Sequence, residues 1–347
     1  MQLIATGDPF SVSPYYYTSD NTGHGNTISS VVTARGCEQL DVLGIKQYLH
    51  KSPDDIRTCF QKIKKLPPNC DLLLEHGKLI VRSQQAIKTV NKNLFELLVQ
   101  ALRRDTACYT RCALALSGGI DSALILALIK EAAIENIEIY TLATGMQGYC
   151  ELEITKRTAQ YYGVKLNIAK ASQVDFVNAL PAAIRSCEAP LYNLHPVSKL
   201  LLARAMKSDG VDCVISGDAA DQVFSGSAAN NYLPIVGSIM RGEGIGFVSP
   251  FFDKQVVAFG LSVMDSDKSA LRKLGLSLLP EFLQQQKKQP RLAPVMDAGK
   301  YWNQKCIDRI AQQINLQPDL ANDSLTMLWT TLGMLVQTIC EKQTCVE

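Results

Sequence analysis

Histidines and long apolar runs are scarce in this sequence. The four histidines, His24, His50, His76 and His195, are scattered along 347 residues, so neither a histidine-based triad nor a histidine metal cluster is indicated. No apolar segment reaches the roughly 20 residues that a membrane-spanning helix needs. The first residues, MQLIATGDPF, lack the basic start and the long apolar stretch of a signal peptide. We therefore expect a cytoplasmic protein without a membrane partner.

An excess of charge of either sign is also missing. The 35 lysines and arginines nearly balance the 33 aspartates and glutamates, for a formal charge of +2. With no lysine-rich block, this balance argues against a nucleic-acid partner. The 11 cysteines follow no disulfide framework, and the close pairs Cys108–Cys112 and Cys340–Cys345 lack the second Cys or His pair of a zinc site. We therefore expect the cysteines to be ordinary thiols in a reducing compartment.

Apolar residues make up 47% of the chain, and from residue 112 onward their pattern predicts strands that alternate with helices. Such alternation requires a parallel sheet covered on both faces. The right-handed crossover rule makes a doubly wound α/β sheet the expected fold class. The predicted strands span 112–116, 137–144, 164–169 and 211–216, and the predicted helices span 120–133, 151–162 and 197–208.

The segments on either side of this region have different patterns. Residues 83–105 read as one long amphipathic helix. The residues before it read as short β pieces, with a turn at His76-Gly77 and helical patches at 43–50 and 54–63. After Pro250 only helices are expected, at 253–264, 268–278, 300–313 and 324–341.

The strongest local signal is the loop SGGIDS at 117–122, between a predicted strand and a predicted helix. Its two glycines allow a tight turn that brings backbone N–H groups against an anion, and the helix N-terminus adds its positive end. Ser117 and Ser122 can donate hydrogen bonds to phosphate oxygens. Asp121 would repel a phosphate unless it holds a Mg²⁺ ion that bridges to the phosphates. No Gly-Lys-Ser/Thr follows, so the loop is not a Walker A motif.

This loop resembles the SGGxDS loop of the N-type ATP pyrophosphatases, which split ATP between its α and β phosphates. The stretch SGDAADQVFSG at 216–226 is similar to SGEGxDExFGG of the asparagine synthetase family. This resemblance implies that the sheet has the adenine nucleotide α-hydrolase-like fold. Three further motifs of the asparagine synthetase family follow along the chain in the family's order. SPFFD at 249–253 resembles the family's VPFLD, and KSALR at 268–272 resembles its KxxLR. Leu279-Pro280 followed by Lys287-Lys288 resembles its LP…RxK.

The N-terminal stretch resembles the glutaminase domain of the same family. DPFSVSPYYY at 8–17 is similar to RDPFGVRPLYY, and 66–80 is similar to that domain's LPPGH…DGxL end. The nucleophilic cysteine that the family carries at its N-terminus is absent, because position 2 is Gln2, and a glutaminase needs this thiolate. We therefore expect residues 1–84 to be a truncated β-rich remnant of a glutaminase domain. Residues 85–347 would form the synthetase domain with its C-terminal helices.

The resemblance also implies a set of site residues. Asp121 and Asp221 would be the Mg²⁺ ligands, although Asp221 is also compatible with a plain helix N-cap. Adenine would be recognised by backbone groups at Leu116, Thr144 and Gly217. The remaining contacts to ATP or pyrophosphate would come from Ser117, Gly118, Gly119, Ser122 and Ser216.

Three further residues are catalytic candidates. Lys288 corresponds to the family's catalytic lysine and could stabilise developing negative charge, but Lys287 fits almost as well, and both are also compatible with surface lysines. Asp218 stands where asparagine synthetases have Glu, and a carboxylate there could orient or deprotonate the attacking amine; it could equally be a surface carboxylate. Gln222 replaces an acidic residue of the family motif, which puts asparagine itself in doubt as the product.

These features predict ATP-dependent amide formation through an acyl-adenylate, with release of AMP and pyrophosphate. The substrates would be a small-molecule or peptide carboxylate and an amine, as for the β-lactam synthetases and lasso-peptide cyclases. A separate glutaminase or peptide-binding subunit is an expected protein partner. One alternative is an ammonia-dependent, asparagine-synthetase-type enzyme. Another is a nucleotide-binding subunit without catalysis. Transfer RNA modification predicts a basic extension or a cysteine pair for sulfur transfer, and neither is visible.

Overall fold

The computed structural model describes residues 1–32, 39–87, 92–226, 232–285, 298–320 and 322–344. Its centre is a five-stranded sheet in the order β11-β10-β7-β8-β9, in which every neighbouring pair is parallel. This confirms the predicted α/β class with a parallel sheet. The strands are β7 (Cys112–Ala115), β8 (Ile137–Ala143), β9 (Leu166–Lys170), β10 (Cys213–Ile215) and β11 (Gly246–Val248).

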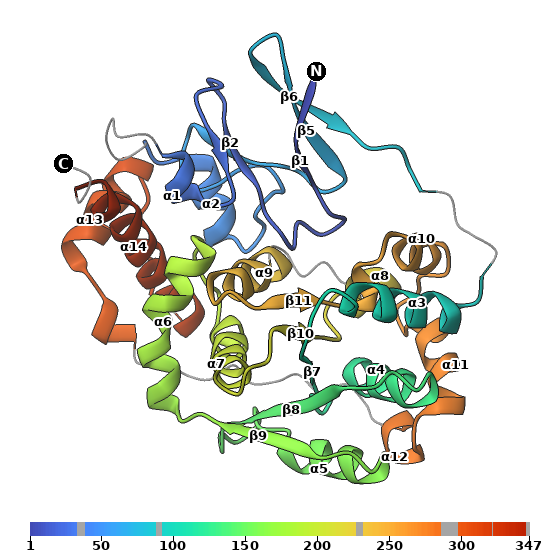
Figure 1. Cartoon of the computed structure of the whole chain (residues 1–347). Helices are drawn as coiled ribbons and strands as arrows, with labels where there is room; N and C mark the ends of the chain where they lie inside the picture. Colours follow the sequence, from blue (N-terminus) through green and yellow to red (C-terminus); the bar gives the residue numbers. More distant parts are fainter. Residues whose placement is uncertain (33–38, 88–91, 227–231, 286–297, 321, 345–347) are drawn as a thin grey trace.

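Helices cover both faces of this sheet (Figure 1). Along β7, Cys112 and Leu114 belong to the apolar layer that contains α3 and α4, whereas Ala113 packs with residues of α7 and α9. Adjacent side chains of a strand point to opposite faces, so β7 is buried on both sides, as its continuous apolar run CALAL predicts. The main covering helices are α3 (Leu94–Thr106), α4 (Ile120–Glu131), α5 (Leu152–Tyr161), α7 (His195–Ser208) and α9 (Tyr232–Gly242).

The strand order places a topological switch point between β7 and β10. From β7 the chain proceeds to β8 and β9 on one side and then to β10 and β11 on the other. Because Ile215 pairs with Leu114, the loops that leave the carboxyl ends of β7 and β10 begin side by side. Open α/β sheets bind their ligands at such a point.

The first 83 residues contain two small antiparallel sheets. One has the order β1-β5-β6 and the other β3-β2-β4. The predicted hairpin turn is confirmed, since His76 and Gly77 connect β5 to β6 with φ values of 49° and 76°. The elements are β1 (Gln2–Thr6), β2 (Tyr16–Thr18), β3 (His24–Gly25), α1 (Ile28–Val31), α2 (Val42–Leu49), β4 (Ile63–Lys65), β5 (Cys70–Glu75) and β6 (Lys78–Ser83).

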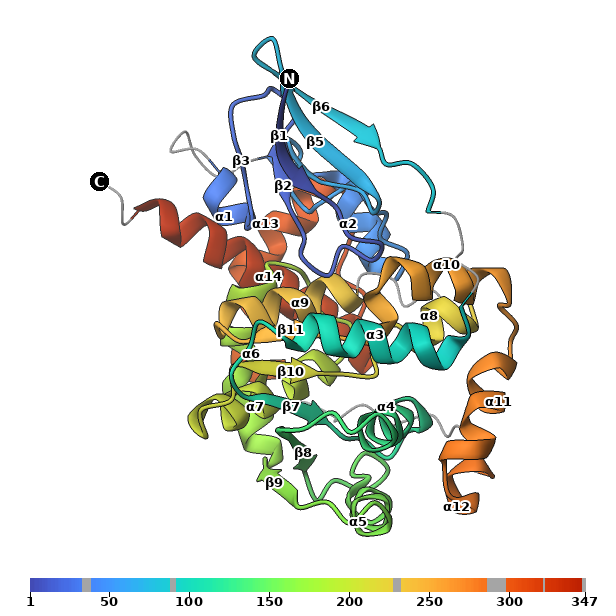
Figure 2. The same ribbon diagram turned by 45° about the vertical axis from the view of Figure 1, so that its right-hand side comes forward.

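A second set of helices joins this region to the sheet. Tyr16, Ile28 and Ile45 share one apolar core with residues of α6 and α14, and Figure 2 shows α1 and α2 beside α13 and α14. Among the described residues, no helix combines the length and apolar character needed to cross a membrane. The remaining elements are α6 (Gln173–Cys187), α8 (Ala220–Phe224), η1 (Pro250–Phe252), α10 (Lys254–Ser262), α11 (Ser269–Leu278), α12 (Glu281–Gln284), η2 (Ala298–Tyr301), α13 (Gln304–Ile314) and α14 (Asp323–Thr344).

Two of the sequence-based helix assignments are wrong. The long helix expected at 83–105 begins only at Leu94, where the side chain of Asn93 accepts a hydrogen bond from the Glu96 N–H and caps it. The patch at 54–63 is not helical, because the Asp54 carboxylate accepts from the Ile56 N–H and forms a turn instead. The helices α6, α8 and α9 and strand β11 were not predicted.

Candidate nucleotide-binding site

The loop after β7 is shaped by its own serines. The Ser117 N–H donates to Ser122 Oγ at 3.0 Å, and the Gly119 N–H donates to Ser117 Oγ at 3.1 Å. The two hydroxyls lie 2.9 Å apart. Both serines therefore hold the loop closed over the N-terminus of α4, which places the positive end of that helix at the site.

Glu151 fixes the same loop from the side. The Gly118 N–H donates to its carboxylate at 2.9 Å. A Cβ added at position 118 would lie 2.6 Å from Ile154 Cγ2 and 2.8 Å from Glu151 Cβ, so only glycine fits there. Glu151 was not predicted as a site residue. Its position directly before α5, at the sheet edge where the phosphate loop lies, is the signal that could have identified it.

The loop after β10 meets the first loop through Gly217. A Cβ at this position would lie 2.9 Å from the Ser122 N atom and 3.1 Å from Asp121 Cβ, so the backbones touch. Two residues later, Ala219 adopts φ 76°. The resembling SGEGxD motif has glycine at this position, and the left-handed conformation costs a non-glycine residue roughly 1–2 kcal/mol. The chain keeps the shape of the motif despite the substitution.

Asp121 and Asp221 point toward one cation, the ammonium of Lys268. Lys268 Nζ lies 2.8 and 2.9 Å from the two oxygens of Asp121 and 2.8 Å from an oxygen of Asp221. The Lys268 side chain is only 10% exposed. Its burial would lower its pKa, but the two carboxylates outweigh that effect and raise the pKa above the ordinary value. The structure thus brings the two predicted metal ligands together, and it adds a lysine that the sequence indicated only as part of a motif.

These two carboxylates fit a metal that arrives with phosphates. In the part of the chain that the structure describes, no group of three or more His, Cys, Asp or Glu side chains could hold a metal ion alone. Mg²⁺ is commonly held by one or two carboxylates together with substrate phosphates and water. The ammonium of Lys268 already contacts both aspartates, so their spacing allows one cation to bind both carboxylates.

Two cavities that share wall residues lie along this edge of the sheet. The larger, of about 270 Å³, lies between the two loops and includes Asp121, Gly217 and Asp221 in its walls. The smaller, of about 90 Å³, is lined by Leu116, Thr141 and Tyr149 among others. Leu116 and Gly217, two of the three backbone positions expected to recognise adenine, therefore face these cavities. Thr144 is not in either wall; its hydroxyl accepts from the Met146 N–H at 3.3 Å.

Asp218 is engaged rather than free. Lys199 Nζ lies 2.7 Å from its carboxylate, and the Ser216 hydroxyl donates to the same oxygen at 2.5 Å. Lys199 was not predicted as a site residue. One turn earlier on α7, the ring centre of His195 lies 5.3 Å from the ring centre of Tyr149 in a tilted arrangement. Burial together with the charge of Lys199 lowers the pKa of His195. Lys287 and Lys288, the catalytic lysine candidates, lie outside the described residues.

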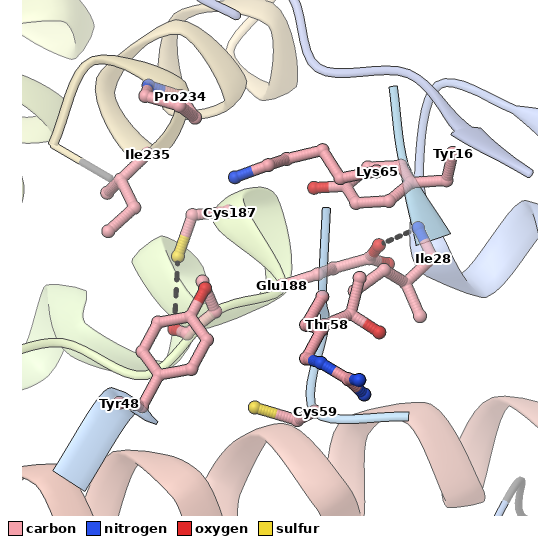
Figure 3. Close-up of a pocket in the computed structure, with 12 residues that line it drawn as sticks. Tyr16, Ile28, Tyr48, Thr58, Cys59, Lys65, Cys187, Glu188, Pro234 and Ile235 are labelled. Carbon is pink, nitrogen blue, oxygen red and sulfur yellow. Dashed lines mark hydrogen bonds between the residues drawn. The ribbon is translucent and has the colours of Figure 1, made fainter. Parts of the chain in front are cut away.

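A third cavity, between the N-terminal region and the helices, is not a substrate site. Figure 3 shows its walls, where Glu188 accepts from the Ile28 N–H and the ammonium of Lys65 points inward. Its volume of about 20 Å³ holds a water molecule but no larger ligand. It lies apart from Asp121 and Asp221, which are absent from its walls.

Residues 93–241 match the asparagine synthase family model. The chain is 24% identical over 242 residues to asparagine synthetase [glutamine-hydrolyzing] 1 of Bacillus subtilis, covering 65% of this chain and 37% of that protein. It is 25% identical over 260 residues to amidase chry2 of Gibberella zeae, covering 65% and 38%. The chain thus spans a little over a third of the length of these curated relatives.

Among solved structures, NMN synthetase from Francisella tularensis is 14% identical, with a TM-score of 0.38 over 68% of this chain and 91% of that one. This similarity is too low to add to the topology described above.

Proposed function

We propose that the protein uses ATP to activate a carboxylate and convert it to an amide, in keeping with the match of residues 93–241 to the asparagine synthase family model. The observation that carries the proposal is the convergence of Asp121 and Asp221 on one cation between the two loops at the switch point. A site built this way suits a nucleotide whose phosphates carry a divalent metal ion.

In the proposed reaction, a carboxylate oxygen bonds to the α-phosphorus of ATP and pyrophosphate leaves. The nitrogen of an amine or of ammonia then bonds to the acyl carbon, and AMP leaves. The N-terminus of α4 would bind the phosphates, since the N–H groups of Ser117, Gly118 and Gly119 already donate within the protein. A Mg²⁺ ion held by Asp121 and Asp221 would neutralise phosphate charge. Lys268 keeps these two carboxylates together by neutralising their repulsion.

We propose a product other than asparagine. Asp218 is one methylene shorter than the Glu of the asparagine synthetase motif, and Lys199 pairs with it. Gln222, in the wall of the same cavity, replaces an acidic residue of that motif. Two of the curated relatives are named amidases rather than asparagine synthetases. These features support a tailoring amide or lactam synthetase over an ammonia-dependent enzyme that acts on aspartate.

A non-catalytic nucleotide-binding subunit is the second candidate, and one observation favours it. Gln222, in the wall of the larger cavity, replaces an acidic residue of the asparagine synthetase motif, so a carboxylate that could serve catalysis is missing while the loops that would hold the nucleotide remain. The functional assay decides between the two candidates.

The test is product analysis with the purified chain, Mg²⁺ and ATP, in the presence of a panel of amino acids and dicarboxylic acids, with and without ammonium chloride or methylamine. The proposal predicts that at least one acid stimulates the release of AMP and pyrophosphate in equal amounts. Release of ADP and phosphate would contradict adenylation. Nucleotide binding with no acid-dependent product from the whole panel would favour the non-catalytic subunit.

A further inference from the structure

Lys199 is a basic residue placed where the two cavities meet. It lies on the second turn of α7, and its side chain is 20% exposed. It lines both the larger cavity between the loops and the smaller cavity beside Leu116. Among the described residues that line either cavity, it is the one lysine or arginine.

The position of Lys199 matches one part of a bound nucleotide, an argument that rests on the function proposed above. A nucleotide with its base in the smaller cavity and its outer phosphates at the 117–122 loop must pass from one cavity to the other. Ala115, Ser117 and Lys199 line both cavities and so mark their junction. The α-phosphate lies between the base-bearing sugar and the outer phosphates, and therefore belongs at this junction.

The other lysine of the site is already committed to carboxylates. Lys268 lies between Asp121 and Asp221 and is absent from the walls of both cavities. Lys199 has three N–H donors, and in the part of the chain that the structure describes its hydrogen-bond partners are Asp218 at 2.7 Å and Ser216 at 3.3 Å. One donor is thus left for a phosphate oxygen.

We propose that Lys199 binds the α-phosphate of the nucleotide and stabilises the charge that develops there during adenylation. In that step a carboxylate oxygen forms a bond to the α-phosphorus, the bond to the bridging oxygen breaks, and the electron pair leaves with pyrophosphate. An ammonium held in place before the reaction stabilises the added charge without reorganising. Asp218 is the residue that holds it there, and it also competes with the phosphate for the ammonium.

Calorimetric titration of the full chain with AMP and with adenosine tests this role, since the two ligands differ by the α-phosphate. The wild-type chain is expected to bind AMP more tightly than adenosine. Lys199→Met should weaken AMP binding roughly 10- to 100-fold, the range for a hydrogen bond to a charged group, and leave adenosine binding unchanged. Lys199→Arg should keep most of the preference for AMP. Asp218→Asn should strengthen AMP binding, because the ammonium loses its competing partner.

Lys130→Met is the control. Lys130 is an exposed lysine in the last turn of α4 and lines neither cavity, so this variant should bind both ligands as the wild type does. The inference is overturned if Lys199→Met keeps the wild-type preference for AMP. It is also overturned if this variant loses adenosine binding as well, which would indicate a structural role. If the wild-type chain binds neither ligand, the proposed function itself fails, together with the inference.

Discussion

The charged residues of this site pair with residues of opposite charge that come from distant parts of the chain. Asp121 lies in the first turn of α4, Asp221 lies in the first turn of α8, and Lys268 directly precedes α11. Two carboxylates that face each other at a half-buried site repel, and the ammonium between them removes that repulsion. The same pair of carboxylates is the proposed metal site, so the lysine and the metal ion stabilise the same arrangement.

Replacing this ammonium should therefore make the protein depend on a metal ion. Lys268→Met is expected to lower the free energy of unfolding by about 2 kcal/mol, because the two carboxylates lose the ammonium that neutralises their mutual repulsion. Urea unfolding in EDTA measures the loss. Millimolar Mg²⁺ should then stabilise this variant more than it stabilises the wild-type chain. Lys273→Met is the control. It replaces an exposed lysine on α11, the helix that Lys268 precedes, and should unfold as the wild type does. Equal effects of Mg²⁺ on all three proteins would contradict a metal site at these aspartates.

Two glycines inside helices differ in how closely other parts of the chain approach them. In α9, a Cβ at Gly237 would lie 1.7 Å from the carbonyl oxygen of Val12, so the N-terminal segment rests directly on the helix backbone. In α14, by contrast, a Cβ at Gly333 would lie 3.5 Å from its nearest neighbour, Ile307 Cγ1. The two glycines are both inside helices, yet only Gly237 is required by packing.

The two positions should respond oppositely to alanine. Gly237→Ala is expected to cost about 1–3 kcal/mol of stability, because the added methyl group forces α9 and the N-terminal segment apart. Gly333→Ala should be neutral or should stabilise by up to about 1 kcal/mol, as alanine favours the helix. Thermal unfolding of both variants measures this difference. A Gly237→Ala variant as stable as Gly333→Ala would show that Val12 does not pack on α9.

Most of the central sheet could be predicted from the sequence, because its strands are short apolar runs bounded by turn residues. Helix α6 was missed; it has Pro181 in its interior, and a proline ordinarily ends a helical pattern. Among the site residues, Asp121 and Asp221 follow predicted strands, so their meeting at one sheet edge could be foreseen. Lys199 could not, since its partner Asp218 is 19 residues away and only the fold brings the two together. For Glu151 the sequence offered only its position directly before α5, because its contact with Gly118 joins residues 33 apart.

On the scale of the whole molecule, the N-terminal sheets and the C-terminal helices stabilise each other. Besides the apolar core that they share, Glu188 at the end of α6 accepts hydrogen bonds from the Ile28 and Ser29 N–H groups at the start of α1. Glu188 is 3% exposed. A buried carboxylate that caps another region's helix ties the two regions into one folding unit.

This coupling predicts one cooperative unfolding transition for the chain. Glu188→Ala should lower the free energy of unfolding by about 2 kcal/mol or more, because the N–H groups of α1 lose a charged acceptor. Circular dichroism in urea measures the midpoint, and Glu131→Gln, at an exposed position of α4, should leave it unchanged. Two separate transitions in the wild-type chain, with only one shifted by Glu188→Ala, would mean that the N-terminal region folds independently.

In the proposed function, Asp121 and Asp221 hold a divalent cation, and with it the phosphates of ATP, between the two loops. A crystal structure of the chain with Mg²⁺ and α,β-methylene ATP would show whether they do. We expect a Mg²⁺ ion in contact with both carboxylates, the phosphates on the 117–122 loop and the adenine beside Leu116. A nucleotide bound elsewhere, or both carboxylates still paired with Lys268 and no metal ion between them, would contradict it.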